Sequence, residues 1–184
     1  MHMATATRRW TRADLERMPD DGNRYEVLDG ELFVTPQAAA AHQWISTLLS
    51  SALVQYCLRH DLGWVAGPGA VVFGDSELQP DVQVIPQPGG PRPDAEWKEL
   101  PTPLLVVEVL SESTRQRDLK KKKAAYLRLG IPTYWIVDRY QRCVIMATGR
   151  PGESAIVTDV LRWQPRGDLP ALEIPLESVF AKGT

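Results

Sequence analysis

The 184-residue sequence has few cysteines, few histidines and no long apolar run. Its two cysteines, Cys57 and Cys143, exclude a disulfide scaffold and a four-cysteine zinc site. Its three histidines, His2, His42 and His60, are too scattered along the chain to predict a zinc motif. No apolar run approaches the ~20 residues that cross a bilayer, and the N-terminus carries no hydrophobic signal core. We therefore expect a soluble, cytoplasmic protein with no membrane partner.

Three common catalytic patterns are also missing. The chain has no glycine-rich phosphate loop, no nucleophile elbow and no dinucleotide fingerprint. Hydrophobic residues make up 43% of the chain and charged residues 24%, which is typical of a globular protein. We expect one domain over residues 1–184, with an N-terminal helix and turn over 1–23 and a functional or mobile proline- and glycine-rich loop over 86–103.

Charge is low overall but unevenly placed. The formal net charge is −2, which argues against a polybasic mode of DNA binding. Residues 115–128 hold seven cations and one acid, a net charge of +6 that leaves −8 for the rest of the chain. Such a run forms either a solvated helix face, its commoner role, or a strip that contacts phosphates. Charge alone does not separate these two interpretations.

Hydrophobic patterning predicts both helices and strands. Thr11 and Asp14 have the spacing of a capping box, so we expect a short helix that ends near Pro19. Asp29-Gly30 separates two alternating segments and predicts a β-hairpin. Apolar residues then recur at helical or strand spacing along the chain. We expect long helices over 38–60 and 114–129, and strands over 24–28, 31–34, 71–73, 82–85, 104–110, 134–137, 143–146, 155–157 and 160–161.

The order of these elements predicts a mixed α/β (α+β) fold in which helices pack against one sheet. The continuous apolar character of residues 104–110 indicates a central strand that is buried on both faces. Segments 134–137 and 143–146 are expected to form a second hairpin, and segments 155–157 and 160–161 to extend the sheet.

Two carboxylates carry the chemistry. Glu108 interrupts the apolar central strand, where an unpaired carboxylate is costly, so it must be paired, protonated or bound to a metal. Asp81 follows Pro80 at the start of another predicted strand, which taken alone is ordinary turn material. Two carboxylates on adjacent strands can hold Mg²⁺ or Mn²⁺, and such an ion polarises a phosphoryl oxygen and activates water. Asp81 and Glu108 together therefore predict a metal site, the alternatives being a turn cap and an internal ion pair.

Segments 25–32, 80–82, 107–111 and 130–138 carry a family resemblance. They resemble the PD-(D/E)xK nuclease superfamily and, more closely, a large bacterial family of restriction endonucleases of the Uma type. The resemblance implies a restriction-endonuclease-like mixed β-sheet flanked by helices, with an N-terminal hairpin and additional C-terminal strands. The chain departs from the superfamily pattern at Leu110, because the residue two positions after the acid is a lysine there.

The related family places this lysine on the following helix, in a pattern that Asp118, Lys122 and Tyr126 match. Helical spacing alone leaves Lys122 and Lys123 as candidates, and the family pattern selects Lys122. We expect Lys122 to neutralise charge on the scissile phosphate or to orient the attacking water. The alternative is that all of the lysines over 120–123 are solvated and cover apolar area with their stems.

The sequence offers further, weaker candidates for site residues. Glu31 is either a third acid near the metal or an edge-strand charge, and His42 either assists proton transfer or packs at a helix start. Ser111 and Thr114 are expected to cap the basic helix. Contacts to the nucleic acid backbone are expected from the 86–103 loop and from Arg115, Arg117, Lys120, Lys121 and Lys123.

We therefore expect a metal-dependent endonuclease that hydrolyses phosphodiester bonds of nucleic acid, with DNA as its substrate. Its predicted catalytic residues are Asp81, Glu108 and Lys122, with Glu31 and His42 as further candidates, and Asp81 and Glu108 are its predicted ligands for Mg²⁺ or Mn²⁺. The resemblance also implies a homodimer. Two alternatives remain open: a binding module of the same fold without turnover, such as a mobile-element accessory protein, and a hydrolase of a small phosphodiester.

Overall fold

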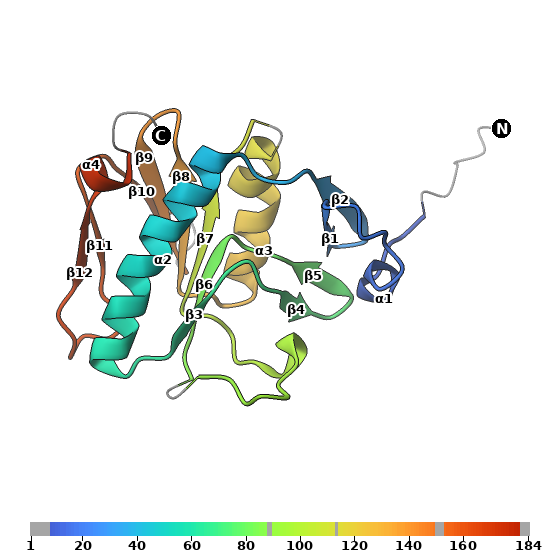
Figure 1. Ribbon diagram of the computed structural model, residues 1–184, viewed down its shortest axis with the longest axis horizontal. Coiled ribbons are helices and arrows are strands. Elements are labelled where there is room, and N and C mark those ends of the chain that lie inside the picture. Colours follow the sequence, from blue (N-terminus) through green and yellow to red (C-terminus); the bar gives the residue numbers. More distant parts are fainter. Residues whose placement is uncertain (1–7, 88–89, 113, 150–152, 181–184) are drawn as a thin grey trace.

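A mixed six-stranded sheet lies at the centre of the structure, and α2 crosses one of its faces (Figure 1). The computed structural model describes residues 8–87, 90–112, 114–149 and 153–180. The first seven residues of the expected N-terminal segment, and Pro88 and Gly89 of the expected loop, lie outside these described residues.

The helical elements follow the chain in the order α1 Arg12–Leu15, α2 Ala40–His60, η1 Trp97–Glu99, η2 Arg117–Lys122, α3 Lys123–Arg128 and α4 Leu176–Val179. The strands are β1 Arg24–Leu28, β2 Glu31–Thr35, β3 Trp64–Ala66, β4 Val71–Phe73, β5 Ser76–Leu78, β6 Val82–Ile85, β7 Leu105–Val109, β8 Thr133–Asp138, β9 Cys143–Thr148, β10 Ser154–Val157, β11 Val160–Trp163 and β12 Leu172–Pro175.

The described strands form three sheets, not the single sheet expected from the element order. The central sheet has the order β10-β9-β8-β7-β6-β3, a second sheet has the order β2-β1-β5-β4, and β11 pairs with β12. The prediction that segment 160–161 extends the central sheet is wrong, because β11 pairs with β12 instead. Segment 155–157 does extend it, since β10 pairs with β9. The mixed α+β class with flanking helices is confirmed.

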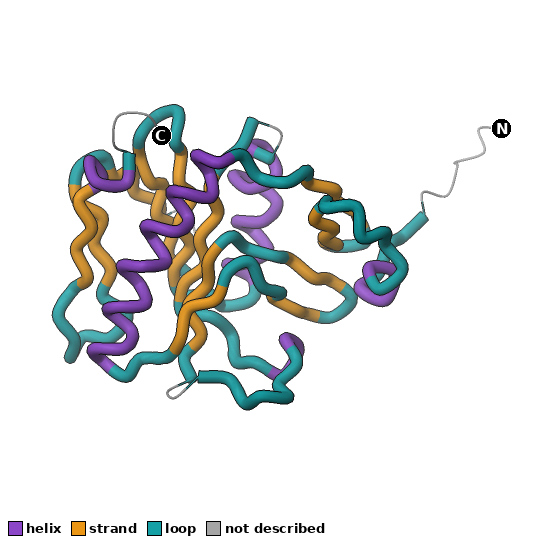
Figure 2. The backbone as a smooth tube through the Cα atoms, viewed as in Figure 1, coloured by secondary structure: helices purple, strands orange, loops and turns teal. Residues whose placement is uncertain are grey.

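Strand β7 is buried along its whole length, as its apolar sequence predicts. Its odd-numbered residues join the core cluster that contains Leu49 and Leu53 of α2. Val106 instead joins the second cluster, which contains Tyr126 of α3. Side chains alternate along a strand, so Glu108 faces the same side as Val106 and points toward η2 and α3. Figure 2 shows these helices on the face of the sheet opposite α2.

The N-terminal elements confirm the local predictions. Thr11 and Asp14 form the capping box of α1, with Asp14 accepting from the Thr11 backbone N–H at 2.9 Å. β1 and β2 form the predicted hairpin, and Asp29 and Gly30 in its turn have φ of 52° and 90°. Those left-handed values are the ones that a two-residue type I′ turn requires. The hairpin then pairs through β1 with β5, which places β1 in the second sheet.

The helical connection between β7 and β8 joins two parallel neighbours. The sequence predicts one regular helix over 114–129, but residues 117–122 form a π-helix before α3 continues as an α-helix. The Tyr134 hydroxyl donates to the Asp118 carbonyl oxygen at 3.2 Å within this wide turn. π-Helical turns are rare and occur often at functional sites.

Candidate active site

Glu108 is the centre of a buried polar cluster. Its Oε1 accepts a hydrogen bond from Lys122 Nζ at 2.7 Å and from the Tyr126 hydroxyl at 3.0 Å. Lys122 lies on the π-helical turn and Tyr126 on α3, so both reach the strand from one side. No described residue donates a hydrogen bond to Glu108 Oε2.

Asp81 lies beside this strand. It precedes β6, whose Val82 pairs with Val107 of β7, and its Oδ2 accepts from the Val109 backbone N–H at 2.8 Å. The same oxygen lies 3.0 Å from His42 Nε2, and Oδ1 accepts from Arg24 Nη1 at 2.9 Å. The structure therefore brings the two predicted metal ligands, Asp81 and Glu108, to neighbouring strands.

Lys122 joins two acids. Its ammonium lies 2.7 Å from Glu26 Oε1 as well as from Glu108, and 3.9 Å from Asp118 Oδ1. Glu26 comes from β1 and also receives the Gln79 backbone N–H at 2.7 Å. Lys122 has no exposed side-chain surface, so it is not one of the solvated lysines of the alternative interpretation.

The cluster carries more acid than base. Its four buried carboxylates are Glu26, Asp81, Glu108 and Asp118, and the Lys and Arg side chains that pair with them are Arg24, Arg117 and Lys122. One negative charge is therefore left without a permanent cationic partner when all four acids are ionised. Such an excess in a buried site favours either a proton or a bound cation.

The pKa values show where that excess falls. Burial, together with the charges of Asp81, Asp118 and Glu26, raises the pKa of Glu108 to about 8 despite the nearby ammonium of Lys122. Burial also disfavours the charged form of Asp81, but its hydrogen bond to His42 and the charge of Arg24 outweigh this and lower its pKa to about 2. Asp81 is therefore the permanently ionised acid, and Glu108 is the acid that holds a proton near neutral pH.

A cavity of about 210 Å³ opens beside Glu108. Its walls include His42, Glu108, Asp118 and two arginines, Arg24 and Arg139. His42 Nδ1 and Arg139 Nε are buried and have no hydrogen-bond partner among the described residues. A cavity lined by two carboxylates and by two residues that each carry an unpartnered nitrogen is suited to a polar ligand.

The donor set of this site fits a hard divalent cation. Magnesium is usually held by one or two carboxylates with water and substrate oxygens filling the other positions. Glu108 Oε2 and the neighbouring Asp81 supply this number of carboxylates, and a cation there would offset the excess negative charge. Within the described residues, no preassembled group of three or more His, Cys, Asp or Glu side chains surrounds a metal position. Water and substrate would have to complete the coordination.

The remaining basic residues lie in different environments. Lys120 and Lys121 are exposed, and Lys123 donates to Ser154 Oγ at 2.6 Å. Arg115 pairs with the buried Asp138 at 2.6 Å. Arg117 is 11% exposed and lies 3.5 Å from Glu26, so it belongs to the buried cluster and not to an exposed strip.

Sequence reasoning missed Glu26 and Arg24, and it offered Glu31 as either a third acid near the metal or an edge-strand charge. The side chain of Glu31 is 58% exposed and pairs with Lys121 at the surface, so the structure does not bring it to Glu108. Glu26, which has no exposed surface, joins the buried cluster instead. Its position in the alternating hairpin carries no signal of burial, because β5 and the π-helical turn cover it only in the folded protein.

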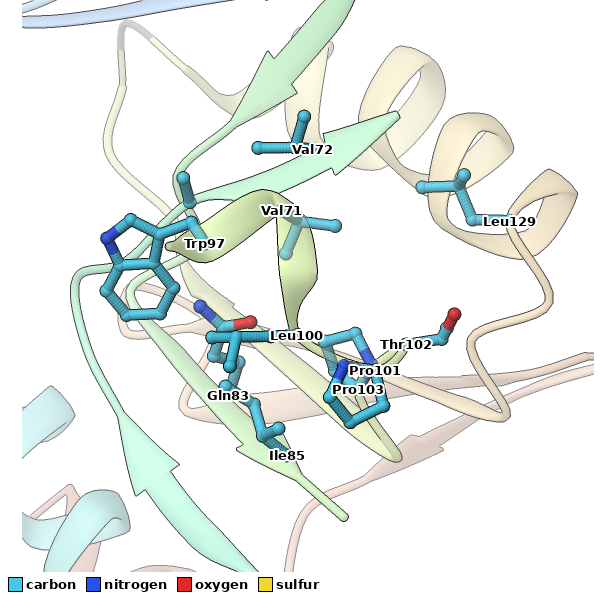
Figure 3. Close-up of a pocket in the computed structure, with 11 residues that line it drawn as sticks. Val71, Val72, Gln83, Ile85, Trp97, Leu100, Pro101, Thr102, Pro103 and Leu129 are labelled. Carbon is cyan, nitrogen blue, oxygen red and sulfur yellow. The ribbon is translucent and has the colours of Figure 1, made fainter. Parts of the chain in front are cut away.

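The proline- and glycine-rich loop contributes to a second cavity, of about 60 Å³, whose walls among the described residues carry no charged side chain (Figure 3). Trp97 of this loop lies over Gly69, where a Cβ atom would meet its ring at 2.3 Å. Gln83 supplies an amide to the wall, and its Nε2 donates to the Gly69 carbonyl oxygen at 2.9 Å. No acidic or basic side chain lines this cavity, so it lacks groups for phosphodiester hydrolysis.

The fold and the buried acid–lysine cluster define a protein of the restriction-endonuclease-like class. The family model Uma2, described as "Putative restriction endonuclease", matches residues 12–177. The chain therefore belongs to the Uma2 family of nucleases, which confirms the resemblance predicted from its motifs.

A solved structure supports the same fold. It is described as the "Crystal structure of a putative nuclease belonging to DUF820 from Anabaena variabilis ATCC 29413", and it superposes with a TM-score of 0.78 at 18% sequence identity. The match covers 92% of this chain and 97% of that chain. Among curated proteins, no relative matches the sequence. No helix of the described residues is long and apolar enough to cross a membrane.

Proposed function

We propose that this protein is a metal-dependent endonuclease that hydrolyses phosphodiester bonds of DNA. The observation that carries the proposal is the buried carboxylate of Glu108, which lines a cavity with polar walls and lies on the strand next to the ionised Asp81. Family membership supports nuclease activity, and the excess of acid over base supports a cation as the missing component.

Glu108 and Asp81 would hold the cation. Mg²⁺ or Mn²⁺ bound there supplies Lewis-acid polarisation of a phosphoryl oxygen and an activated water. Lys122 and Tyr126 both bind Glu108 Oε1, which fixes the carboxylate and leaves Oε2 without a donor among the described residues. His42 and Arg24 fix the two oxygens of Asp81 in the same way.

Lys122 has a different role from the one expected from the sequence. It does not line the cavity, and both of its closest partners are carboxylates. We propose that it is a positioning residue that compensates the charge of Glu26 and Glu108, while arginine side chains face the substrate.

A nicking assay tests the function. Supercoiled plasmid is incubated with the protein and Mn²⁺ or Mg²⁺, beside the variants Glu108→Gln and Asp81→Asn and the matched control Glu31→Gln. We expect wild type and the control to nick the plasmid, and both site variants to lose at least about a hundredfold in rate. Equal activity of Asp81→Asn and wild type would refute the proposed site.

Two further measurements separate the alternatives. Turnover of a chromogenic diester without affinity for duplex DNA would indicate a small-molecule phosphodiesterase. No stabilisation by Mn²⁺, together with unchanged behaviour of Asp81→Ala, would indicate a binding module. Two copies of the active site would let the protein cut both strands of a duplex in one binding event, so we propose a homodimer, which light scattering of the purified protein tests.

A further inference from the structure

The cations that face the cavity differ in how they are paired. Arg24 donates from Nη1 to Asp81 and to the Gln79 carbonyl oxygen, both at 2.9 Å. Arg139, in the turn that follows β8, lines the same cavity and makes no ion pair with any described carboxylate. Its Nε is buried without a hydrogen-bond partner.

The neighbourhood explains why Arg139 has no anionic partner, although its Nη2 donates to the uncharged Tyr140 hydroxyl at 2.5 Å. The adjacent acid, Asp138, is held by Arg115 at 2.6 Å and accepts the backbone N–H groups of Tyr140 and Gln141. The Arg139 guanidinium instead lies over the Tyr140 ring, with its Cζ 4.3 Å from the centroid. This stacking orients the side chain without neutralising it. A buried, unsatisfied N–H of a charged group is costly unless a ligand accepts from it.

We propose that Arg139 is the phosphate anchor of this cavity. A planar guanidinium presents N–H groups in a fork that matches two oxygens of a phosphate. Asp118 in the same walls, and Glu108 wherever it is ionised, would repel an anion, so a cation without an anionic partner favours its entry. The chemical class of ligand is a phosphodiester group, and the inference rests on the proposed nuclease site. It assigns to Arg139 the contact with substrate that Lys122 is too buried to make.

Inorganic phosphate tests the anchor without any chemistry. The melting temperature of the intact protein is measured in phosphate and in chloride at equal ionic strength, for wild type, Arg139→Gln, Arg139→Lys and the control Arg59→Gln. Arg59 is an exposed arginine in the last turn of α2, roughly 25 Å along the helix from His42. We expect phosphate to stabilise wild type and the control.

The expected changes in phosphate affinity follow from the loss of the contact between the Arg139 guanidinium and two phosphate oxygens. Arg139→Gln should weaken phosphate binding by about tenfold or more, and Arg139→Lys should retain part of it because the charge remains. Absence of a phosphate effect on wild type would overturn the inference. An equal effect on wild type and Arg139→Gln would overturn it too.

Binding of a short duplex oligonucleotide in EDTA provides the second arm. The logarithm of the association constant falls linearly with the logarithm of the salt concentration. Loss of one phosphate contact in Arg139→Gln should make this slope less steep by about 0.9, and Arg59→Gln should leave it unchanged. If the protein cleaves DNA and Arg139→Gln has an unchanged slope, Arg139 is not the phosphate anchor, but the proposed nuclease activity stands. If phosphate binding depends on Arg139 but the protein cleaves no nucleic acid, Arg139 is the phosphate anchor and the proposed nuclease activity is wrong.

Discussion

The substitution Glu108→Gln isolates the electrostatics of the buried acid. Its pKa is raised to about 8, from an ordinary value of 4.5, chiefly because burial disfavours the charged form. Between these pH values the folded protein holds a proton that the unfolded chain has released. Stability is therefore lost as pH rises through this window, and the loss is complete above about pH 8.

The magnitude follows from the width of the window. One pKa unit corresponds to about 1.4 kcal/mol, so the full shift corresponds to about 5 kcal/mol of unfolding free energy. About 3 kcal/mol of that loss falls between about pH 5.5 and about pH 8.5. Glutamine resembles the protonated acid in shape and charge, and its carbonyl can still accept from Lys122 and Tyr126. The variant therefore lacks the ionisation that destabilises wild type.

We expect Glu108→Gln to match wild type within about 1 kcal/mol near pH 5.5 and to exceed it by about 3 kcal/mol near pH 8.5. Urea unfolding in EDTA, followed by the fluorescence of the six tryptophans, measures the difference. The control Glu31→Gln makes the same chemical change on a side chain that is 58% exposed. Its free energy of unfolding should therefore differ from that of wild type by the same amount at both pH values. A variant that is less stable by the same amount at both pH values would refute the reasoning, since Glu108 would then be ionised throughout as the partner of Lys122.

Three further predictions concern the same cluster. Lys122→Ala leaves Glu26 and Glu108 without the ammonium between them and should lower the free energy of unfolding by about 3–5 kcal/mol in urea. The control Lys123→Ala should change it by no more than about 0.5 kcal/mol. Equal losses in the two variants would contradict a buried, paired role that is particular to Lys122. Tyr126→Phe removes the 3.0 Å hydrogen bond to Glu108 and should cost about 1–2 kcal/mol in the same assay. The control Tyr140→Phe removes only a surface hydrogen bond from Arg139 and should stay within about 0.5 kcal/mol of wild type. Mn²⁺ should raise the melting temperature of wild type more at pH 8 than at pH 6, because binding displaces the proton of Glu108. A shift that is independent of pH, or that persists in Glu108→Gln, would place the ion elsewhere.

Local rules explain what was predicted from the sequence. The capping box at Thr11, the turn at Asp29-Gly30 and the buried strand around Glu108 each depend on a few consecutive residues. Glu108 was recognisable because a charge inside an apolar run has few explanations. Helical spacing narrowed the lysine to two positions, and the structure buries Lys122 and leaves Lys123 beside Ser154.

Contacts between distant residues explain what was not predicted. The strands β3 and β5 have only three residues each, and their pairing with β6 and β1 joins segments that are distant in the sequence. Arg24 and Asp81 are separated by 57 positions, and Glu26 pairs with a lysine on another element, so neither pair leaves a local pattern. Nothing in the composition of residues 117–122 distinguishes a π-helix from an α-helix, because the wide turn is stabilised by its tertiary contacts.

The wide turn couples the register of the helix to the charges beneath it. An α-helix advances about 100° per residue, so relaxation of the wide turn to α-helical geometry would shift the preceding residues by about one position. Lys122, through Glu26 and Glu108, and the Tyr134 hydroxyl on the Asp118 carbonyl hold the turn open. Loss of these contacts would therefore rotate the basic segment 117–122 about the helix axis, so that a different lysine would face the sheet. A change in one buried charge would reach the protein surface as a rearranged pattern of cations.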